Sequence, residues 1–132
     1  MYLLDTNICI YAMKGTYPHI AEMLLRIHPD EIKVSSVTVM ELAYGAAKSQ
    51  WSERSAQAMQ MFLASFDILP FTERDATVCG LLRAKLAACG STIGAYDLMI
   101  ASQGIARSLT VVTHNTGEFQ RVPGIRLEDW AV

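Results

Sequence analysis

The chain begins Met1-Tyr2-Leu3-Leu4-Asp5-Thr6-Asn7, and the rest of the fold is organised around this stretch. Its apolar residues, 2–4, predict a short strand buried on both faces, because strands of parallel sheets are continuous apolar runs. The polar residues that follow, and a second apolar stretch at 8–11, indicate a turn into a helix capped by Thr6 or Asn7. Asp5 is then expected at the carboxyl end of a buried strand, where open α/β sheets place their ligand sites. The alternative is that Asp5 only caps the helix.

The composition indicates one domain, spanning residues 1–132, with a large core. Hydrophobic residues make up 52% of the chain and charged residues 18%, so we expect a partner or a second copy to cover part of the apolar surface. No apolar run is a convincing membrane span, and the N-terminus lacks the basic region of a signal peptide. The formal charge of −2 argues mildly against nucleic-acid binding but is compatible with a local basic rim.

The cysteines indicate the cellular compartment. Cys9, Cys79 and Cys89 are odd in number, far apart in the sequence and surrounded by apolar residues. We therefore expect small core residues in a reducing, cytoplasmic environment, and neither a disulfide framework nor a zinc site.

Apolar periodicity and turn residues predict strands separated by helices. Helices are expected from residue 8 to Gly15, from Pro18 to residue 27, over 36–48, from Ser52 to residue 66, from Thr72 to Gly90, from Gly94 to about Arg107, and briefly after residue 114. Further strands are expected over 32–35, 68–69, 109–113 and 123–127. Strands that alternate with helices pair in parallel, so the predicted fold is a single α/β domain. Its central parallel sheet has about four to five short strands and helices on both faces.

Glu41 lies in the predicted helix that begins near Ser36. Thr38-x-x-Glu41 matches a capping box, in which the carboxylate only returns to a backbone amide. A helix capped by Ser36 would instead turn Glu41 inward, alongside Val37 and Tyr44. The residues alone leave both interpretations open.

Asp97 lies in the first turn of a helix that is otherwise apolar. The helix macrodipole alone stabilises an acid at such a position. The apolar neighbours at 96 and 98–101 nevertheless predict a helix buried on most sides, where an unpaired carboxylate costs several kcal/mol. No basic residue stands at helical spacing before Arg107, so a metal ion is the economical partner for this acid.

Asn115 and Glu118 follow the strand predicted over 109–113, and so lie past its carboxyl end. Asn115 is compatible with a left-handed turn residue, and Glu118 with a solvated acid in the first turn of a short helix. If these groups meet Asp5 instead, several carboxylates converge and repel one another unless a cation lies between them. All-oxygen ligands favour Mg²⁺ or Mn²⁺ over zinc. Such a metal site is suited to phosphodiester hydrolysis.

Four ordered motifs carry a family resemblance. They are Leu4-Asp5-Thr6-Asn7, Thr38-x-x-Glu41-Leu42, Asp97-x-x-Ile100-Ala101 and Val112-Thr113-His114-Asn115. Together they resemble the PIN-domain nucleases, and among these the toxins of the VapBC toxin–antitoxin systems. The segments 35–49, 93–97 and 119–130 look like the enteric branch of these toxins. The resemblance covers nearly the whole chain, from residue 1 to residue 130.

The resemblance implies a metal-dependent endoribonuclease that uses Mg²⁺, with Mn²⁺ as a substitute. Asp5, Glu41 and Asp97 match the family's acidic cluster, with Asp5 and Asp97 as the direct metal ligands and Glu41 near a second metal or its water. Many family members have a fourth acid where this chain has Asn115, so the resemblance leaves one or two metals open, and Glu118 is expected to take that catalytic role.

The resemblance also implies that Thr6 and Asn7 orient Asp5 or a phosphate, with Asn115 in a supporting role. It implies a homodimer and an inhibitory VapB-type antitoxin. The branch resemblance further suggests tRNA as the substrate, with the anticodon loop of initiator tRNA as the cleavage site.

Two other functions remain open. A phosphatase of the haloacid dehalogenase type also begins with an apolar strand that ends in Asp, but its second Asp, the general acid, is replaced here by Asn7, which cannot transfer the proton. A non-catalytic binding module, in which every acid is a helix cap, predicts no Mg²⁺ affinity.

Overall fold

The computed structural model describes all residues from Met1 to Val132. Five strands form one sheet: β1 (Tyr2–Leu4), β2 (Ile32–Ser35), β3 (Asp67–Leu69), β4 (Thr110–Val112) and β5 (Arg126–Glu128). Their order in the sheet is β3-β2-β1-β4-β5 and every pairing is parallel, so the predicted fold class is confirmed. The chain builds the sheet outward from β1 on one side and then returns to build β4 and β5 on the other. The carboxyl end of β1 therefore lies at the topological switch point, where α/β sheets bind ligands.

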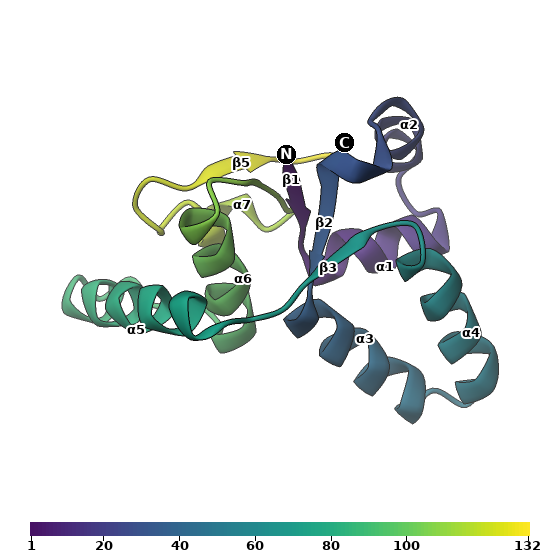
Figure 1. The fold of residues 1–132 in the computed structure, drawn as a ribbon, viewed down its shortest axis with the longest axis horizontal. Helices are drawn as coiled ribbons and strands as arrows, with labels where there is room; N and C mark the ends of the chain where they lie inside the picture. Colours follow the sequence, from purple (N-terminus) through teal and green to yellow (C-terminus); the bar gives the residue numbers. More distant parts are fainter.

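Seven α-helices connect the strands: α1 (Thr6–Lys14), α2 (Pro18–Arg26), α3 (Ser36–Lys48), α4 (Ser52–Leu63), α5 (Glu73–Ala88), α6 (Ala95–Ala106) and α7 (Thr116–Phe119), with a 3₁₀ turn η1 (Pro29–Glu31) before β2. Figure 1 shows α5 and α6 on one side of the strands and α1 to α4 on the other. None of these helices has the length and apolar character that a membrane crossing requires.

The core divides into two clusters because successive strand residues point to opposite faces of the sheet. Leu3 and Val111 belong to the cluster under α5 and α6, whereas Leu4 and Val112 belong to the cluster under α1, α2 and α4. Helix α6 approaches β4 closely at Gly104, where a Cβ atom would lie 2.5 Å from Val111 Cγ2. Glycine at this position therefore lets the helix that carries Asp97 pack directly on the sheet.

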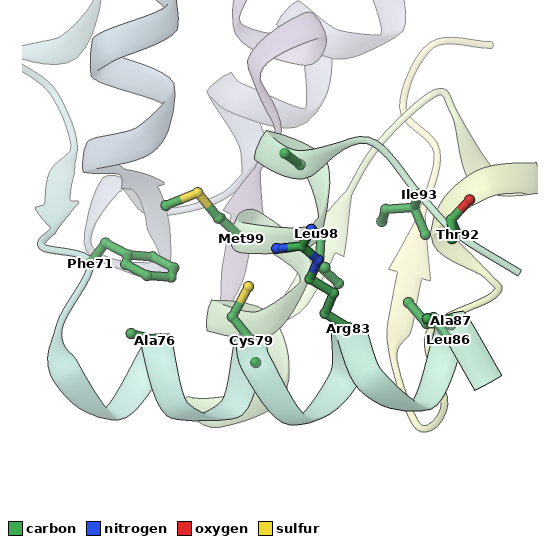
Figure 2. Close-up of a pocket in the computed structure, with 12 residues that line it drawn as sticks. Phe71, Ala76, Cys79, Arg83, Leu86, Ala87, Thr92, Ile93, Leu98 and Met99 are labelled. Atoms are coloured by element: carbon green, nitrogen blue, oxygen red, sulfur yellow. The ribbon is translucent and has the colours of Figure 1, made fainter.

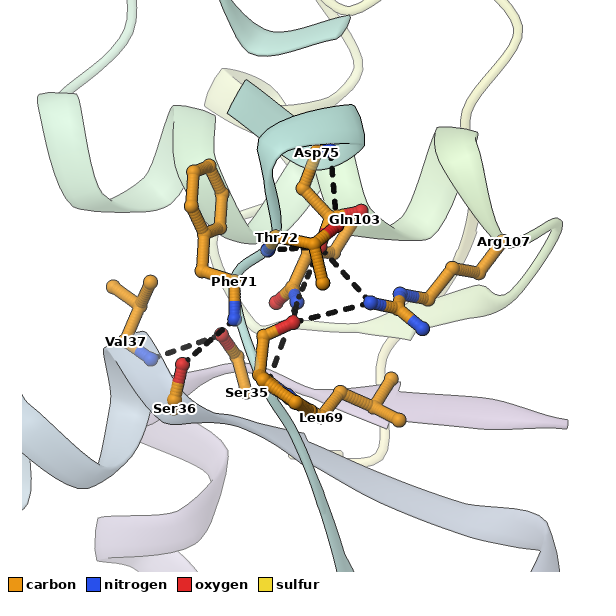
Figure 3. A network of polar contacts seen from close by, with 10 residues as sticks. Ser35, Ser36, Val37, Leu69, Phe71, Thr72, Asp75, Gln103 and Arg107 are labelled. Atoms are coloured by element: carbon orange, nitrogen blue, oxygen red, sulfur yellow. Dashed lines mark hydrogen bonds and ion pairs between the residues drawn. The ribbon is translucent and has the colours of Figure 1, made fainter. Parts of the chain in front are cut away.

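A buried polar network fixes the β3–α5 connection to α6 (Figure 3). Asp75 Oδ2 accepts hydrogen bonds from the Thr72 backbone N–H at 2.9 Å, from Gln103 Nε2 at 3.2 Å and from Arg107 Nη2 at 3.0 Å. Burial alone would raise the pKa of Asp75, but these hydrogen bonds and the charge of Arg107 hold it below its usual range. The capping box predicted at Thr72 is confirmed. Its acid, Asp75, also connects the start of α5 to the end of α6.

Several local predictions are wrong at helix N-termini. Asp5, rather than Thr6 or Asn7, is the N-cap of α1. Helix α3 is capped by Ser35, whose hydroxyl accepts the Val37 N–H, so neither the capping box at Thr38 nor the cap at Ser36 forms; the Ser36 hydroxyl instead accepts the Phe71 N–H. Helix α4 begins after Trp51, one residue earlier than a Ser52 cap would place it. At α1 and α3, an extended residue at the end of the preceding strand reaches the free amides first, whereas no side chain caps α4.

Three predictions about exposure or conformation are also wrong. Tyr44 points to solvent, because the buried stripe of α3 consists of Val37, Thr38, Leu42 and Ala46. Cys89 is exposed, since it follows the last turn of α5, whereas Cys9 is buried as expected; all three cysteines are free. Asn115 has φ −90° and ψ 53°, so it is not a left-handed turn residue.

Candidate active site

Asp5 is buried at the carboxyl end of β1, with an exposed fraction of 2%. Its Oδ1 accepts the Ile8 N–H at 2.9 Å, which makes it the N-cap of α1. Burial raises the pKa of Asp5 to about 6, and the negative charges of Asp97 and Glu41 add to this rise, against the hydrogen bonds from Thr113 and Ile8. The capping function and the placement beside other acids are therefore both real, and burial, with a smaller contribution from those acids, is what raises the pKa of the carboxyl group.

Glu41 is held at the site by Thr6, which also contacts Thr38. Thr6 Oγ1 donates to Glu41 Oε1 at 2.7 Å, and the hydroxyls of Thr6 and Thr38 lie 3.1 Å apart. Thr38 is fully buried and Thr6 nearly so, which fixes the start of α3 against the start of α1. Asn7 is exposed, and its predicted role in orienting Asp5 or a phosphate stays a prediction.

Asp97 lies in the first turn of α6, half-buried beside the same group of acids. Burial raises its pKa to about 6, and the charges of Glu118 and Glu41 add to the rise. The expectation that α6 is buried on most sides is confirmed, because residues 100–104 are all buried. Its first-turn acid therefore lies in surroundings that disfavour an isolated negative charge.

Glu118 is fixed against the N-terminus of α6. Its Oε1 accepts the Gly94 N–H at 2.6 Å and its Oε2 accepts Asn115 Nδ2 at 2.8 Å. These two hydrogen bonds, with the charge of Arg121, hold the pKa of Glu118 below its ordinary value, although burial acts in the opposite direction. Glu118 is the partly exposed first-turn acid of α7 that the sequence suggested, but both its carboxylate oxygens are held by hydrogen bonds. Sequence reasoning missed Gly94, whose only signal was its place before the helix.

None of the acids of this site forms an ion pair with a basic side chain. The ion pairs of the protein involve other residues, and none includes Asp5, Glu41, Asp97 or Glu118. No three His, Cys, Asp or Glu side chains gather closely enough to enclose a metal ion by themselves. Mg²⁺ does not need such a cage, because it is usually bound by one or two carboxylates and completes its shell with water and substrate phosphates. The donors of this site, unpaired carboxylates with hydroxyl and amide neighbours, therefore fit a hard divalent cation.

An apolar hollow of about 610 Å³, whose lining includes none of these acids, lies between α5 and α6 (Figure 2). Nine of its twelve lining residues are hydrophobic, and Arg83 is the one charged group. The hollow contains no carboxylate, so the concave apolar surface of the molecule and its acidic cluster are separate features.

The family model for the PIN domain matches residues 2–125. The chain belongs to the PIN-domain family. Within it, the chain is 42% identical to the tRNA(fMet)-specific endonuclease VapC of Salmonella typhimurium, over 98% of this chain and 97% of that protein. It is 38% identical to ribonuclease VapC2 of Rickettsia felis, over 98% of both chains. These relatives place it among the VapC ribonucleases, so it is not a phosphatase of the haloacid dehalogenase type.

Solved structures show the same relationship. The crystal structure of DNA-bound VapBC from Salmonella typhimurium contains a chain that matches with a TM-score of 0.93 and 42% identity, over 98% of this chain and 97% of that one. VapBC2 from Rickettsia felis, bound to a DNA fragment from its promoter, matches with a TM-score of 0.92 and 37% identity, over 98% of both chains. Like other PIN-domain ribonucleases, the protein is of a divalent-metal-dependent class.

Proposed function

We propose that this protein is the toxin of a VapBC system and cuts tRNA with Mg²⁺, or with Mn²⁺ as a substitute. The observation that carries the proposal is the set of four acids, Asp5 at the carboxyl end of β1, Glu41 in the second turn of α3, Asp97 in the first turn of α6 and Glu118 after β4, none of which forms an ion pair. The branch of the family supports initiator tRNA as the substrate, because the relative from Salmonella typhimurium is named for tRNA(fMet). Cleavage in the anticodon loop is part of the same proposal.

Asp5 and Asp97 are the proposed metal ligands. Asp5 precedes α1 and Asp97 lies in the first turn of α6, two helices on opposite faces of the sheet. Burial raises the pKa of both acids; the charge of Glu41 adds to both rises, and the charge of Asp97 adds to that of Asp5. A bound divalent cation offsets this repulsion, and when bound it positions the scissile phosphate and activates a water. Ionised carboxylates bind the cation, so its affinity should fall as pH decreases through about 6.

Glu41 and Glu118 have supporting catalytic roles in this proposal. The Thr6 hydroxyl holds Glu41 Oε1 and leaves the second carboxylate oxygen free to orient a water. Glu118 uses both oxygens for Gly94 and Asn115, and these donors keep it ionised. It therefore supplies negative charge beside Asp97 in place of the fourth acid that Asn115 replaces. Asn7, at the mouth of the site, is free to donate to a phosphate.

We infer that a VapB-type antitoxin inhibits the protein and that the toxin is a homodimer in the cytoplasm. The two structures with TM-scores above 0.9 are VapBC complexes, which supports the antitoxin. Free cysteines, one of them exposed, fit a reducing compartment.

The test is cleavage of total bacterial tRNA by the purified, antitoxin-free protein, with Mg²⁺ or with EDTA. The matched variants are Asp5→Asn and Asp30→Asn, because Asp30 is an exposed acid that precedes β2 at the opposite edge of the sheet. We expect discrete, Mg²⁺-dependent fragments from the wild type and from Asp30→Asn, and none from Asp5→Asn. Sequencing of the fragment ends then identifies the RNA. Intact RNA with folded wild-type protein would favour the binding-module alternative.

A further inference from the structure

An exposed stripe runs along α3 away from the acids. Met40, Tyr44 and Lys48 follow one another at intervals of four residues, so they share one face of the helix, next to the face of Glu41. Met40 is 42% exposed and Tyr44 is 64% exposed. The Lys48 ammonium lies over the Tyr44 ring, 4.8 Å from its centroid. The stripe therefore presents an aromatic face together with a positive charge.

The stripe continues at the corner between α3 and α4. Trp51 is 59% exposed, and the Arg54 guanidinium lies over its ring, 5.5 Å from the ring centroid. A shallow hollow of about 530 Å³ opens here, and it is lined by Gln50, Trp51, Ser52, Glu53, Arg54 and Gln57. No side chain caps the N-terminus of α4, so its first backbone amides are free to face an anion.

These features match what unpaired nucleotides require of a protein. Bases stack on exposed aromatic rings, arginine and lysine neutralise the phosphates, and amide side chains bind the base edges. Two cations that lie on aromatic rings are an ordinary number for a chain of this length, but here both occur at the same corner between α3 and α4, in a chain whose net charge is −2. Glu53 is the one acid in the hollow.

We propose that Tyr44, Lys48, Trp51 and Arg54, which we call the α3–α4 track, bind unpaired nucleotides of the RNA on one side of the cleaved phosphate. This inference rests on the proposed ribonuclease function. Lys48 lies about 10 Å along the helix from Glu41, and the hollow lies beyond it. The track therefore contacts nucleotides well outside the cleaved phosphate, and it favours RNA with an extended loop over a short fragment.

A protein partner is the competing occupant, because exposed Met, Tyr and Trp also occur at protein interfaces. RNA is favoured for two reasons. The cations lie beside the aromatic rings, so one surface offers both rings for stacking and charges for phosphates, and the track begins beside the acids that would cut the strand. A second copy of the chain or the antitoxin on this surface is an outcome that the test distinguishes.

The test measures equilibrium binding of a fluorescent RNA stem-loop to the catalytically inactive Asp97→Asn protein, so it does not depend on cleavage. In this background we expect Tyr44→Ala and Trp51→Ala each to weaken RNA binding about tenfold. Tyr44→Phe and Trp51→Phe should retain most of the affinity, because stacking needs the ring and not its polar atom. The double variant Lys48→Ala/Arg54→Ala should reduce the dependence of affinity on salt.

Two matched controls lie on α5. Leu81 is an exposed large apolar residue, and Arg74 is an exposed arginine outside every hydrogen bond and ion pair of the protein. Leu81→Ala and Arg74→Ala should leave RNA affinity unchanged, and all variants should keep the melting temperature of the parent. Unchanged RNA affinity in Tyr44→Ala and Trp51→Ala would overturn the proposal. If those variants instead dissociate the homodimer or the antitoxin complex in sedimentation, the surface is a protein interface. Absence of cleavage by the wild type would reject the nuclease function separately.

Discussion

Asp5 and Asp75 are both buried acids in the first residues of a helix, exposed to 2% and 1%, yet their surroundings are opposite. Asp75 is matched with Arg107, Gln103 and the Thr72 N–H, and its pKa is below the usual range. Asp5 has only one backbone amide and one hydroxyl, faces two other acids, and has its pKa raised to about 6. Burial is therefore common to Asp75, which has a structural role, and to Asp5 in the candidate site. What distinguishes the two acids is the charge and hydrogen-bonding capacity of the groups around them.

The difference has an energetic meaning. Removing a buried carboxylate that has a complete set of donors destabilises the fold, because its partners are left unpaired. A buried carboxylate among like charges makes folding less favourable unless a cation is bound. The hydrogen bonds of Asp75 connect α5 to α6. The repulsion between Asp5 and its neighbouring acids instead favours the binding of a metal ion.

The largest effect should come from Asp5→Asn, with a loss of about 1,000-fold in kcat for tRNA cleavage. The amide keeps the shape and the cap to Ile8 but lacks the charge that binds the cation. Melting temperature in EDTA should not fall, because the change removes a repelled buried charge. A variant that kept its activity would show that Asp5 is only a helix cap.

Asp75→Ala should reverse this pattern. We expect the free energy of unfolding to fall by about 3 kcal/mol, because the change leaves Arg107 and Gln103 without their acceptor; this figure is at the lower end for buried pairs because about a third of Arg107 is exposed. The activity of the remaining folded protein should be close to that of the wild type. Urea unfolding measures the first quantity and single-turnover cleavage the second. Equal losses of activity and stability would show that the network also positions Asp97.

The two acids should also respond oppositely to pH in metal-free protein. The folded pKa of Asp5 is raised from 3.8 to about 6, so its favourable contribution is complete below about pH 4 and is lost as pH rises through 6. Relative to Asp5→Asn, the wild type should therefore lose about 2–3 kcal/mol of unfolding free energy between pH 4 and pH 7. The pKa of Asp75 is lowered, so its contribution is present above pH 4 and is lost as pH falls. Urea titrations at several pH values in EDTA measure both contributions to the unfolding free energy. If the contributions of Asp5 and Asp75 changed with pH in the same direction, the opposite pKa shifts given to the two acids would be contradicted.

The smallest effect should come from Asn115→Asp, which replaces a donor to Glu118 by a fourth acid. We expect Mn²⁺ affinity to increase a few-fold at pH 8, because the site gains negative charge, and the pKa of Glu118 to rise as it loses the amide. Calorimetric titration measures the affinity, with Asn115→Ser as the uncharged control. A decrease in affinity for Asn115→Asp alone would show that the hydrogen bond to Glu118 matters more than the charge.

Much of this architecture was predictable because the local signals are strong. The buried run at residues 2–4, the Thr72 capping box and Gly15 at the end of α1, with φ 67°, are decided by hydrophobicity, hydrogen bonding and backbone sterics among near neighbours. The failures are of another kind. Whether Ser35 or Thr38 caps α3 depends on where Thr6 lies, since Thr38 turns to the Thr6 hydroxyl.

The sequence by itself determined the alternation of strands and helices, the acids at the ends of predicted elements, and the family to which those motifs belong. Only the tertiary structure decided which acids meet. It matched Asp75 with Arg107, 32 residues away, and fixed Glu118 to the Gly94 amide, 24 residues away. It left Asp5 and Asp97 beside other acids and without an ion pair to a basic side chain. The physical reason is that a charge is stabilised or destabilised by whatever the fold brings within a few ångströms, and sequence position does not specify those neighbours.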